Sequence, residues 1–205
     1  MDARAWDERY AATGLVWSGS ANQFVAEELA DLRPGRALDL AAGEGRNALW
    51  LAERGWQVRA VDFSQVGLDK GRALAQQHGL VVDWVCADAL TYDPGSDTFD
   101  LVLLAYLQLV ADERRTALRA AVGALLPGGT LLLVAHDSTN LTEGTGGPSD
   151  PSVLFTAEEV LADLDGERFE VQRAERVPRL VQPDEAHRGA PARTAYDVLV
   201  RLVRT

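Results

Sequence analysis

The 205-residue sequence contains one cysteine, one methionine and one lysine, and these shortages exclude several protein classes. A single thiol, Cys86, allows neither a disulfide framework nor a thiolate metal cluster. The longest nearly apolar run, residues 101–111, is too short for a membrane-spanning helix, which needs about 20 residues. The first twenty residues lack the basic and apolar regions of a secretory signal. We therefore expect a cytoplasmic protein with no membrane partner.

The charge and size of the chain set further limits. Subtracting 31 acidic from 20 basic residues leaves a net charge of −11, which disfavours contact with a phosphate backbone. We therefore expect no nucleic-acid partner, and a monomer or a homodimer. Lys70 is the only lysine, a scarcity that we attribute to coding bias. With 47% hydrophobic residues, the chain is expected to form a single domain over residues 1–205.

The chain alternates apolar strand-like runs with helical segments, a pattern typical of a parallel sheet covered by helices on both faces. Strands are predicted over residues 36–40, 57–61, 81–86, 99–104 and 130–135. Helices are predicted over residues 20–33, 45–54, 65–77 and 113–126, with Ser64 and Asp112 as N-caps of the last two. Residues 1–33 would form an N-terminal arm and helix in front of a core over 34–205.

Three segments after the fifth strand have a different character. Residues 168–177 and 195–203 alternate polar and apolar side chains, which predicts an antiparallel pair at one sheet edge. Residues 137–152 are rich in Gly, Ser, Thr and Pro, and their length predicts a lid or binding loop. The fold class is therefore expected to be α/β, with a Rossmann-like, doubly wound sheet.

The segment Asp-Leu-Ala-Ala-Gly-Glu-Gly-Arg-Asn-Ala, residues 39–48, lies where the first strand turns into a helix. Gly43 and Gly45 would let the backbone approach a ligand, and the free N–H groups of the helix favour a negative group. Asp62 follows Gly43 by 19 residues, the spacing at which an acid accepts hydrogen bonds from ribose hydroxyls. The segment therefore predicts a nucleotide-like cofactor.

The same glycine spacing also satisfies the dinucleotide fingerprint, so an NAD(P)-dependent oxidoreductase is an alternative. Two acids argue against it. Asp39 lies where a dinucleotide site usually has an apolar strand end, and Asp88 closes the third strand. The chain also has no room for a separate substrate domain.

These motifs together resemble those of the class I S-adenosylmethionine-dependent methyltransferases over nearly the whole chain. Asp39–Gly45 is similar to their first motif, Asp62 to their second, and Leu-Pro-Gly-Gly at 126–129 to the turn before their fifth strand. Gly-Glu-Gly-Arg-Asn, with Trp-Asp-Glu-Arg-Tyr near the N-terminus, most resembles small-molecule enzymes of the tellurite-resistance and thiopurine type. Ala41 stands where the family has its first glycine. The resemblance implies S-adenosylmethionine as cofactor and seven strands, the last of them antiparallel.

The resemblance implies a role for each matching position. The methionine part of the cofactor would be held by the backbone around Ala41, Gly43 and Gly45, by Asp39, and by a carbonyl of Leu104 or Ala105. The nucleoside part would be held by Asp62 at the ribose, by Phe63 on the adenine, and by Asp88 with the Ala89 N–H at the adenine edge. The acidic ligands of metal-dependent members are missing after the fourth strand, so no metal is expected.

Four residues outside the core motifs have two interpretations each. Trp6, Tyr10 and Trp17 would close over the cofactor, since aromatic faces attract a sulfonium, or they would pack the N-terminal arm on the core. Arg46 would face the methionine carboxylate or lie on the surface.

The methyl acceptor is less defined by the sequence than the cofactor. His136, after the fifth strand, is either a general base or a histidine packed at the strand end, and Tyr106 is the second candidate. We expect a small apolar or aromatic acceptor, by analogy with the family. A non-catalytic, S-adenosylmethionine-binding regulatory protein is a further alternative, because methyl transfer by positioning alone leaves no catalytic signature.

Overall fold

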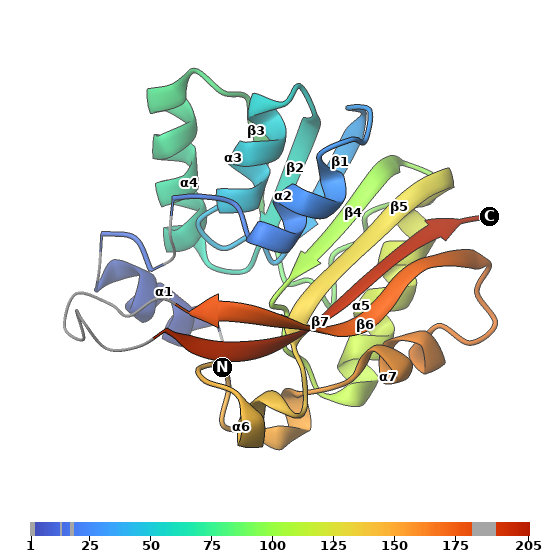
Figure 1. Ribbon diagram of the computed structural model, residues 1–205. Coiled ribbons are helices and arrows are strands. Elements are labelled where there is room, and N and C mark those ends of the chain that lie inside the picture. Colours follow the sequence, from blue (N-terminus) through green and yellow to red (C-terminus); the bar gives the residue numbers. More distant parts are fainter. Residues whose placement is uncertain (1–2, 13, 17–18, 182–191) are drawn as a thin grey trace.

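A computed structural model of the chain, which describes residues 3–12, 14–16, 19–181 and 192–205, contains the predicted seven-stranded sheet (Figure 1). The strands are β1 Arg36–Leu40, β2 Gln57–Asp62, β3 Val82–Cys86, β4 Phe99–Ala105, β5 Leu125–His136, β6 Phe169–Val181 and β7 Arg193–Arg204. Their order is β3-β2-β1-β4-β5-β7-β6, and β7 runs antiparallel to both of its neighbours. The predicted fold class is therefore confirmed.

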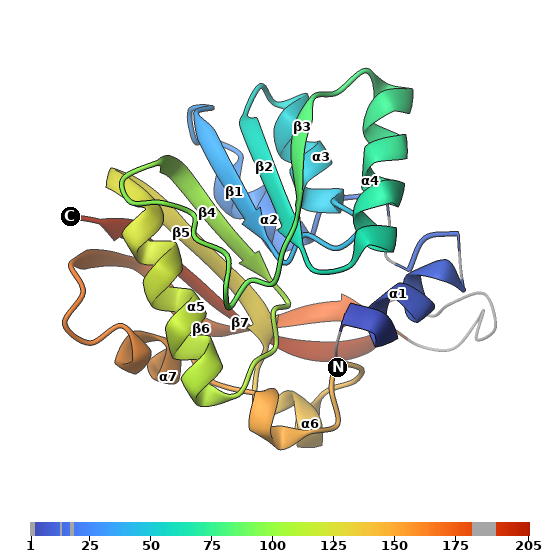
Figure 2. The same cartoon turned by 180° about the vertical axis from the view of Figure 1, so that it is seen from behind.

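Helices cover both faces of the sheet (Figures 1 and 2). The helices are α1 Ala3–Ala11, α2 Gln23–Leu29, α3 Arg46–Glu53, α4 Gln65–His78, α5 Ala111–Ala124, α6 Asn140–Glu143 and α7 Ala157–Asp163. One face carries α2, α3 and α4, and the opposite face carries α5 and α7. Alternate side chains of β4 serve the two faces: Leu101 and Leu103 pack toward α2 and α3, and Val102 and Leu104 toward α5. This double burial explains the continuous apolar character of the strand.

Several element boundaries differ from the sequence predictions. Helix α5 ends at Ala124, because β5 begins at Leu125 and already includes Pro127. Its N-cap residue is Val110, without a side-chain hydrogen bond, so the expected capping role of Asp112 is wrong. Instead, Asp112 lies in the first turn, where its negative charge favours the helix dipole.

The N-terminal and post-β5 segments are more helical than predicted. Helix α2 is shorter than the predicted segment 20–33, and the arm contains α1. The expected loop 137–152 includes α6, and α7 follows it before β6. Each of α1, α6 and α7 has nine residues or fewer, and such short helices depend on tertiary packing rather than on a periodic sequence pattern.

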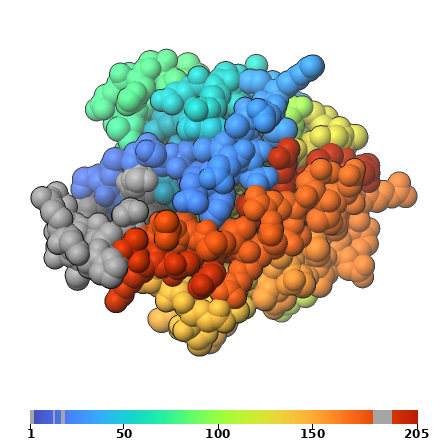
Figure 3. Space-filling view, viewed as in Figure 1, coloured from blue at the N-terminus to red at the C-terminus, as the bar shows by residue number. Residues whose placement is uncertain are grey.

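The β6–β7 hairpin extends past the end of the sheet. The pairing of β5 with β7 ends at His136 and Asp197, whereas β6 and β7 stay paired as far as Val181 and Arg193. The end of the hairpin therefore reaches beyond the carboxyl ends of the parallel strands, toward α1 (Figures 1 and 2). Ion pairs from Glu28 of α2 to arginines of β6 and β7 hold the hairpin, and Figure 3 shows α2 against these strands.

Two glycines of α4 let this helix approach the segment between β1 and α3. A Cβ at Gly67 would lie 3.1 Å from the Gly43 carbonyl oxygen. A Cβ at Gly71 would lie 2.8 Å from the Glu44 carbonyl oxygen and 2.5 Å from the ring of Trp84 on β3. Close packing therefore requires glycine at these two positions of α4, and the same packing fixes the position of the glycine-rich loop.

We predict that Gly71→Ala lowers the free energy of unfolding by about 1–3 kcal/mol, because the added methyl group has no space. Gly123→Ala is the matched control: this glycine also lies in a helix, α5, and a Cβ there meets no atom within 4 Å. The control should raise the free energy of unfolding by up to about 1 kcal/mol. Urea denaturation of both variants would measure this, and equal effects would contradict the packing argument.

Candidate cofactor and active site

The candidate site lies at the carboxyl ends of β1, β2 and β4. The strand order reverses between β1 and β4, and open α/β sheets bind ligands at such a point. Ala41, Gly43 and Gly45 follow β1 with φ angles of 64°, 59° and 76°, all in the left-handed region. A non-glycine residue in this region costs roughly 1–2 kcal/mol, so Ala41 is strained where the family has glycine. This loop leads directly into α3, and the N–H groups of Gly43 and Gly45 donate to Asp62 and to the Ala42 carbonyl oxygen.

Asp62, at the end of β2, holds the glycine loop in place. Its two carboxylate oxygens accept the N–H groups of Gly43 and Ser64, each at 2.8 Å. Burial raises the pKa of this carboxyl, and the two N–H groups partly oppose that rise. A carboxylate has about four acceptor sites, so Asp62 can still accept ligand hydroxyl groups.

Asp39, at β1, is the most unusual group of the site. Its carboxylate is 0% exposed, and among the described residues neither oxygen has a hydrogen-bond partner. Burial and the nearby Asp62 raise its pKa to about 7, and the Ala48 backbone N–H and the Arg46 charge oppose this only in part. A buried carboxylate without a partner is costly unless a cation or donor arrives with a ligand. An ammonium group on a ligand would supply both the positive charge and the hydrogen-bond donors.

The remaining predicted cofactor residues surround the same strand ends. Phe63 follows β2 and is half-buried. Asp88 follows β3 and is exposed, with one oxygen accepting the Leu90 N–H at 2.9 Å. Leu104 and Ala105 end β4. Ala89 is half-buried beside Asp88. The fold thus brings the predicted positions of three strands to one edge.

The aromatic residues of the N-terminal arm are close to the loop. Tyr10 of α1 is buried, and its ring centroid lies 5.3 Å from that of Trp6. A Cβ at Gly67 would lie 3.0 Å from the Tyr10 ring, so α1 packs directly on α4. Trp17, the third aromatic residue, lies outside the described residues.

A second polar cluster lies beside the cofactor residues, at the ends of β4, β5 and the hairpin. The Tyr106 hydroxyl donates to Asp197 Oδ2 at 2.8 Å, and His136 Nδ1 lies 3.3 Å from Asp197 Oδ1. Arg179 Nε donates to Asp197 Oδ2 at 2.6 Å. The rings of Tyr106 and His136 are 4.9 Å apart. Asn22, the N-cap of α2, donates to the Tyr106 hydroxyl at 3.1 Å.

The electrostatics of this cluster distinguish its two candidate bases. Burial and the Asp197 charge raise the pKa of Tyr106 far above its usual value, so Tyr106 remains a neutral donor. Burial raises the pKa of Asp197, but the nearby His136 and the hydrogen bonds from Arg179 and Tyr106 outweigh burial and keep this pKa low. Asp197 is therefore ionised, and its Oδ1 lies near His136 Nδ1 without forming a hydrogen bond to it. The geometry favours His136 over Tyr106 as the base.

Sequence reasoning missed Asp197, Arg179 and Glu44. For Asp197 a signal existed, because this acid interrupts the apolar side of an alternating strand. For Arg179 no local signal was present, since its partner lies across the hairpin. Arg46, of which both interpretations were open, is largely buried near Tyr106 and Asp39, and burial lowers its pKa.

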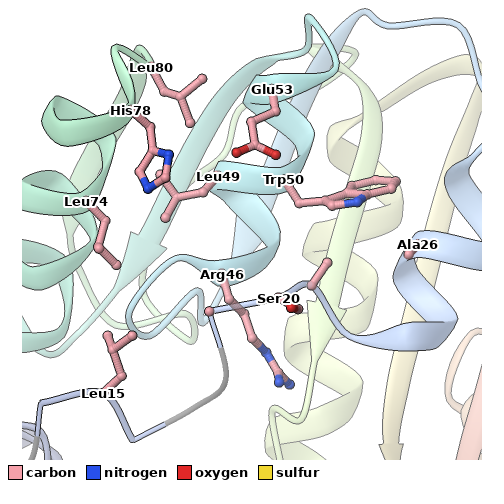
Figure 4. A pocket seen from close by; sticks show the side chains of 12 residues that line it. Leu15, Ser20, Ala26, Arg46, Leu49, Trp50, Glu53, Leu74, His78 and Leu80 are labelled. Carbon is pink, nitrogen blue, oxygen red and sulfur yellow. The ribbon is translucent and has the colours of Figure 1, made fainter.

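A cavity of about 430 Å³ lies on the outer side of α3 (Figure 4). Arg46, Leu49, Trp50 and Glu53 line it from one face of α3, and His78 of α4 lies opposite. The predicted acids Asp39, Asp62 and Asp88 do not line it. Among the described residues, Arg46 is the one predicted site residue that does, so the cavity adjoins the strand-end site only through Arg46.

The described part of the chain shows neither a metal-binding cluster nor a membrane-spanning helix. No group of three or more His, Cys, Asp and Glu side chains is arranged there to hold a metal ion. None of the helices described is long and apolar enough to cross a membrane.

This sheet order and strand-end site define a Rossmann-like protein of the class I methyltransferase fold. Residues 37–129 match the family model described as a methyltransferase domain. The chain thus has the class I methyltransferase fold and a segment similar to a methyltransferase domain, which favours a methyltransferase over the oxidoreductase alternative.

Some known proteins are similar to this chain in sequence, and others share its fold. The tRNA 5-carboxymethoxyuridine methyltransferase of Escherichia coli is 34% identical over 125 residues, which are 58% of this chain and 48% of that protein. The chain spans about half the length of the curated relatives it matches.

Two solved structures share the fold. One comes from work on the conversion of a disulfide bond into a thioacetal group during echinomycin biosynthesis. It has a TM-score of 0.76 and 22% identity, and the match covers 98% of this chain and 92% of that one. TehB from Haemophilus influenzae has a TM-score of 0.74 and 16% identity, and the match covers 90% of this chain and 63% of that one.

The raised pKa of Asp39 predicts a pH-dependent stability. The carboxyl of Asp39 ionises near its usual pKa of 3.8 in the unfolded chain but near 7 in the folded protein. Between about pH 4 and 7 the unfolded chain therefore releases this proton more readily, so the free energy of unfolding falls as pH rises over this range. Asp39→Asn should remove this loss, which is on the order of 4 kcal/mol. We expect the ligand-free variant to match the wild type near pH 4 and to exceed its stability at pH 8. An equal difference at both pH values in denaturant titrations would contradict this.

Proposed function

We propose that this protein transfers the methyl group of S-adenosylmethionine to a small-molecule acceptor. The observation that carries the proposal is the buried carboxylate of Asp39, which has no hydrogen-bond partner among the described residues and lies beside a glycine loop with left-handed backbone. A cationic ligand would relieve its desolvation, and the methionine end of this cofactor is such a ligand. We further propose that the single domain acts in the cytoplasm, as a monomer or a homodimer.

The residues around the crevice suit the parts of the cofactor. Asp39 would bind the ammonium group, Asp62 the ribose hydroxyls, and Asp88 the adenine amino group. Trp6 and Tyr10 of α1, whose ring centroids are 5.3 Å apart, would close over the positive sulfur, since aromatic faces attract a sulfonium. When bound, the cofactor supplies an electrophilic methyl group on its sulfonium.

On the acceptor side, His136 would accept the proton of the acceptor nucleophile. Its Nδ1 faces Asp197, so the other ring nitrogen is left for the acceptor, and the Asp197 carboxylate would stabilise the imidazolium that forms. The Tyr106 hydroxyl is held by Asp197 and Asn22, and this ring serves as a wall beside His136. The balance is one proton moved from acceptor to His136 as the acceptor–methyl bond replaces the sulfur–methyl bond.

The charge of the chain supports a small acceptor over RNA. The net charge is −11, and three acids lie at the ends of the first three strands. The negative charges of RNA would be repelled by these acids, with few basic groups to neutralise them. The tRNA-modifying relative makes RNA the alternative to test, and a steep loss of acceptor binding with salt would favour RNA.

Binding of S-adenosylhomocysteine tests the cofactor proposal. We expect calorimetry to show binding that tightens about tenfold from pH 6 to pH 8, because the ligand requires Asp39 to be ionised and its pKa in the free protein is about 7. Asp39→Asn should bind more weakly and lose this pH dependence, and Asp62→Ala should lose most of the affinity. No binding by the wild type at millimolar ligand would refute the proposal.

Turnover of a His136→Ala variant tests the base. We expect the rate of S-adenosylhomocysteine release, measured with a panel of phenol, thiol and amine acceptors, to fall about 10²–10⁴-fold while cofactor affinity stays intact. Asp197→Asn should shift the pH profile of the rate, since the Asp197 carboxylate lies near the imidazole. His78→Ala, which removes an exposed histidine on α4, is the matched control. Unchanged turnover in His136→Ala would exclude His136 as the base.

A further inference from the structure

The only lysine of the chain lies against the glycine loop. Lys70 is on α4, three residues after Gly67 and next to Gly71, and therefore on the helix face that packs on the loop. Its Nζ is 3.1 Å from Glu44 Oε1 and also donates to the Tyr10 carbonyl oxygen. One ammonium group thus contacts both the cofactor loop and the N-terminal arm. A compact ammonium with three donors suits two oxygens from different segments better than a planar guanidinium does.

Glu44 makes the second half of this connection. Its carboxylate oxygens accept the Val16 N–H at 3.1 and 3.0 Å. The Glu44 side chain is 3% exposed and that of Lys70 is 22% exposed, so water screens this pair less than a surface pair. Gly43 and Gly45, on either side of Glu44, have positive φ angles and so belong to the same constrained loop.

A further tie of the arm does not involve the loop. Asp7 accepts the Ser64 hydroxyl at 2.5 Å and the Val66 N–H at 3.2 Å, both at the beginning of α4. Asp7 therefore fixes the middle of α1 to α4. The connection through Glu44 and Lys70 fixes the later part of the arm, at Tyr10 and Val16.

We propose that Lys70 and Glu44 are positioning residues of the cofactor site, whose ion pair holds Tyr10 and Val16 against the glycine loop and slows cofactor release. The part concerning release rests on the proposed function. Removal of the ammonium would leave a buried carboxylate with only part of its compensation, so the loop and the arm would separate more often. Coding bias explains why lysine is scarce in this chain, whereas the position of Lys70 explains why a lysine is present there.

Amide hydrogen exchange of the ligand-free protein tests the tie itself. In Lys70→Met and in Glu44→Gln, we expect exchange in residues 3–16 to accelerate about tenfold, with the sheet unchanged. Lys70→Arg should restore most of the protection. The matched control is Arg59→Met, which removes an exposed ion pair to Asp83 on the neighbouring strand and should leave the arm unaffected.

Release of S-adenosylhomocysteine, followed by stopped-flow tryptophan fluorescence, tests the positioning role. We expect about tenfold faster dissociation in either variant, and no further increase in the double variant, because both substitutions remove the same interaction. Unchanged arm exchange, or faster exchange in the whole sheet, would overturn the tie. Faster arm exchange with unchanged dissociation would overturn the positioning role. If the wild type binds no S-adenosylhomocysteine, the proposed function fails and the positioning role with it, whereas arm exchange still decides the tie.

Discussion

The arrangement of the site depends on the carboxylate of Asp62. By accepting one N–H from the glycine loop and one from the residue before α4, it joins the ends of β1 and β2 to the start of α4. Two charge-assisted hydrogen bonds in a buried position are stronger than neutral ones and fix the backbone they engage. The strained φ of Ala41, the isolation of Asp39 and the contact of Glu44 with Lys70 all occur within this constrained loop.

The site has two electrostatic halves with different purposes. The cofactor half contains Asp39 and Asp62, two carboxylates whose burial raises their pKa values. The acceptor half contains Asp197, whose carboxylate is also buried but is compensated by Arg179, His136 and Tyr106. Asp39 is buried with little compensation of its charge, whereas Asp197 is buried and compensated. A buried carboxylate of the first kind is where a cationic ligand would bind. This difference supports the proposal that the cofactor binds on the Asp39 side.

Much of the fold could be predicted from the sequence because its signals are local. The five parallel strands coincide with runs rich in apolar residues, and the cap residue Ser64 predicts the beginning of α4 correctly. The shorter helices could not be predicted, because α1 and α6 are too short to be periodic and depend on packing. The start of β5 at Leu125 was also missed, since its pairing with β4 continues the strand through a Pro-Gly-Gly segment typical of a turn.

The sequence by itself predicted the fold class correctly and supplied the prediction of the cofactor side. Acids and glycines at strand ends are adjacent in the chain to the elements that position them, so their spacing carries the information. Only the tertiary structure revealed the polar cluster around Asp197 and the contacts of the single lysine. Asp197 meets Tyr106 across 91 residues, and Lys70 meets Glu44 across 26. Such contacts follow from strand order and helix packing, which no local pattern specifies.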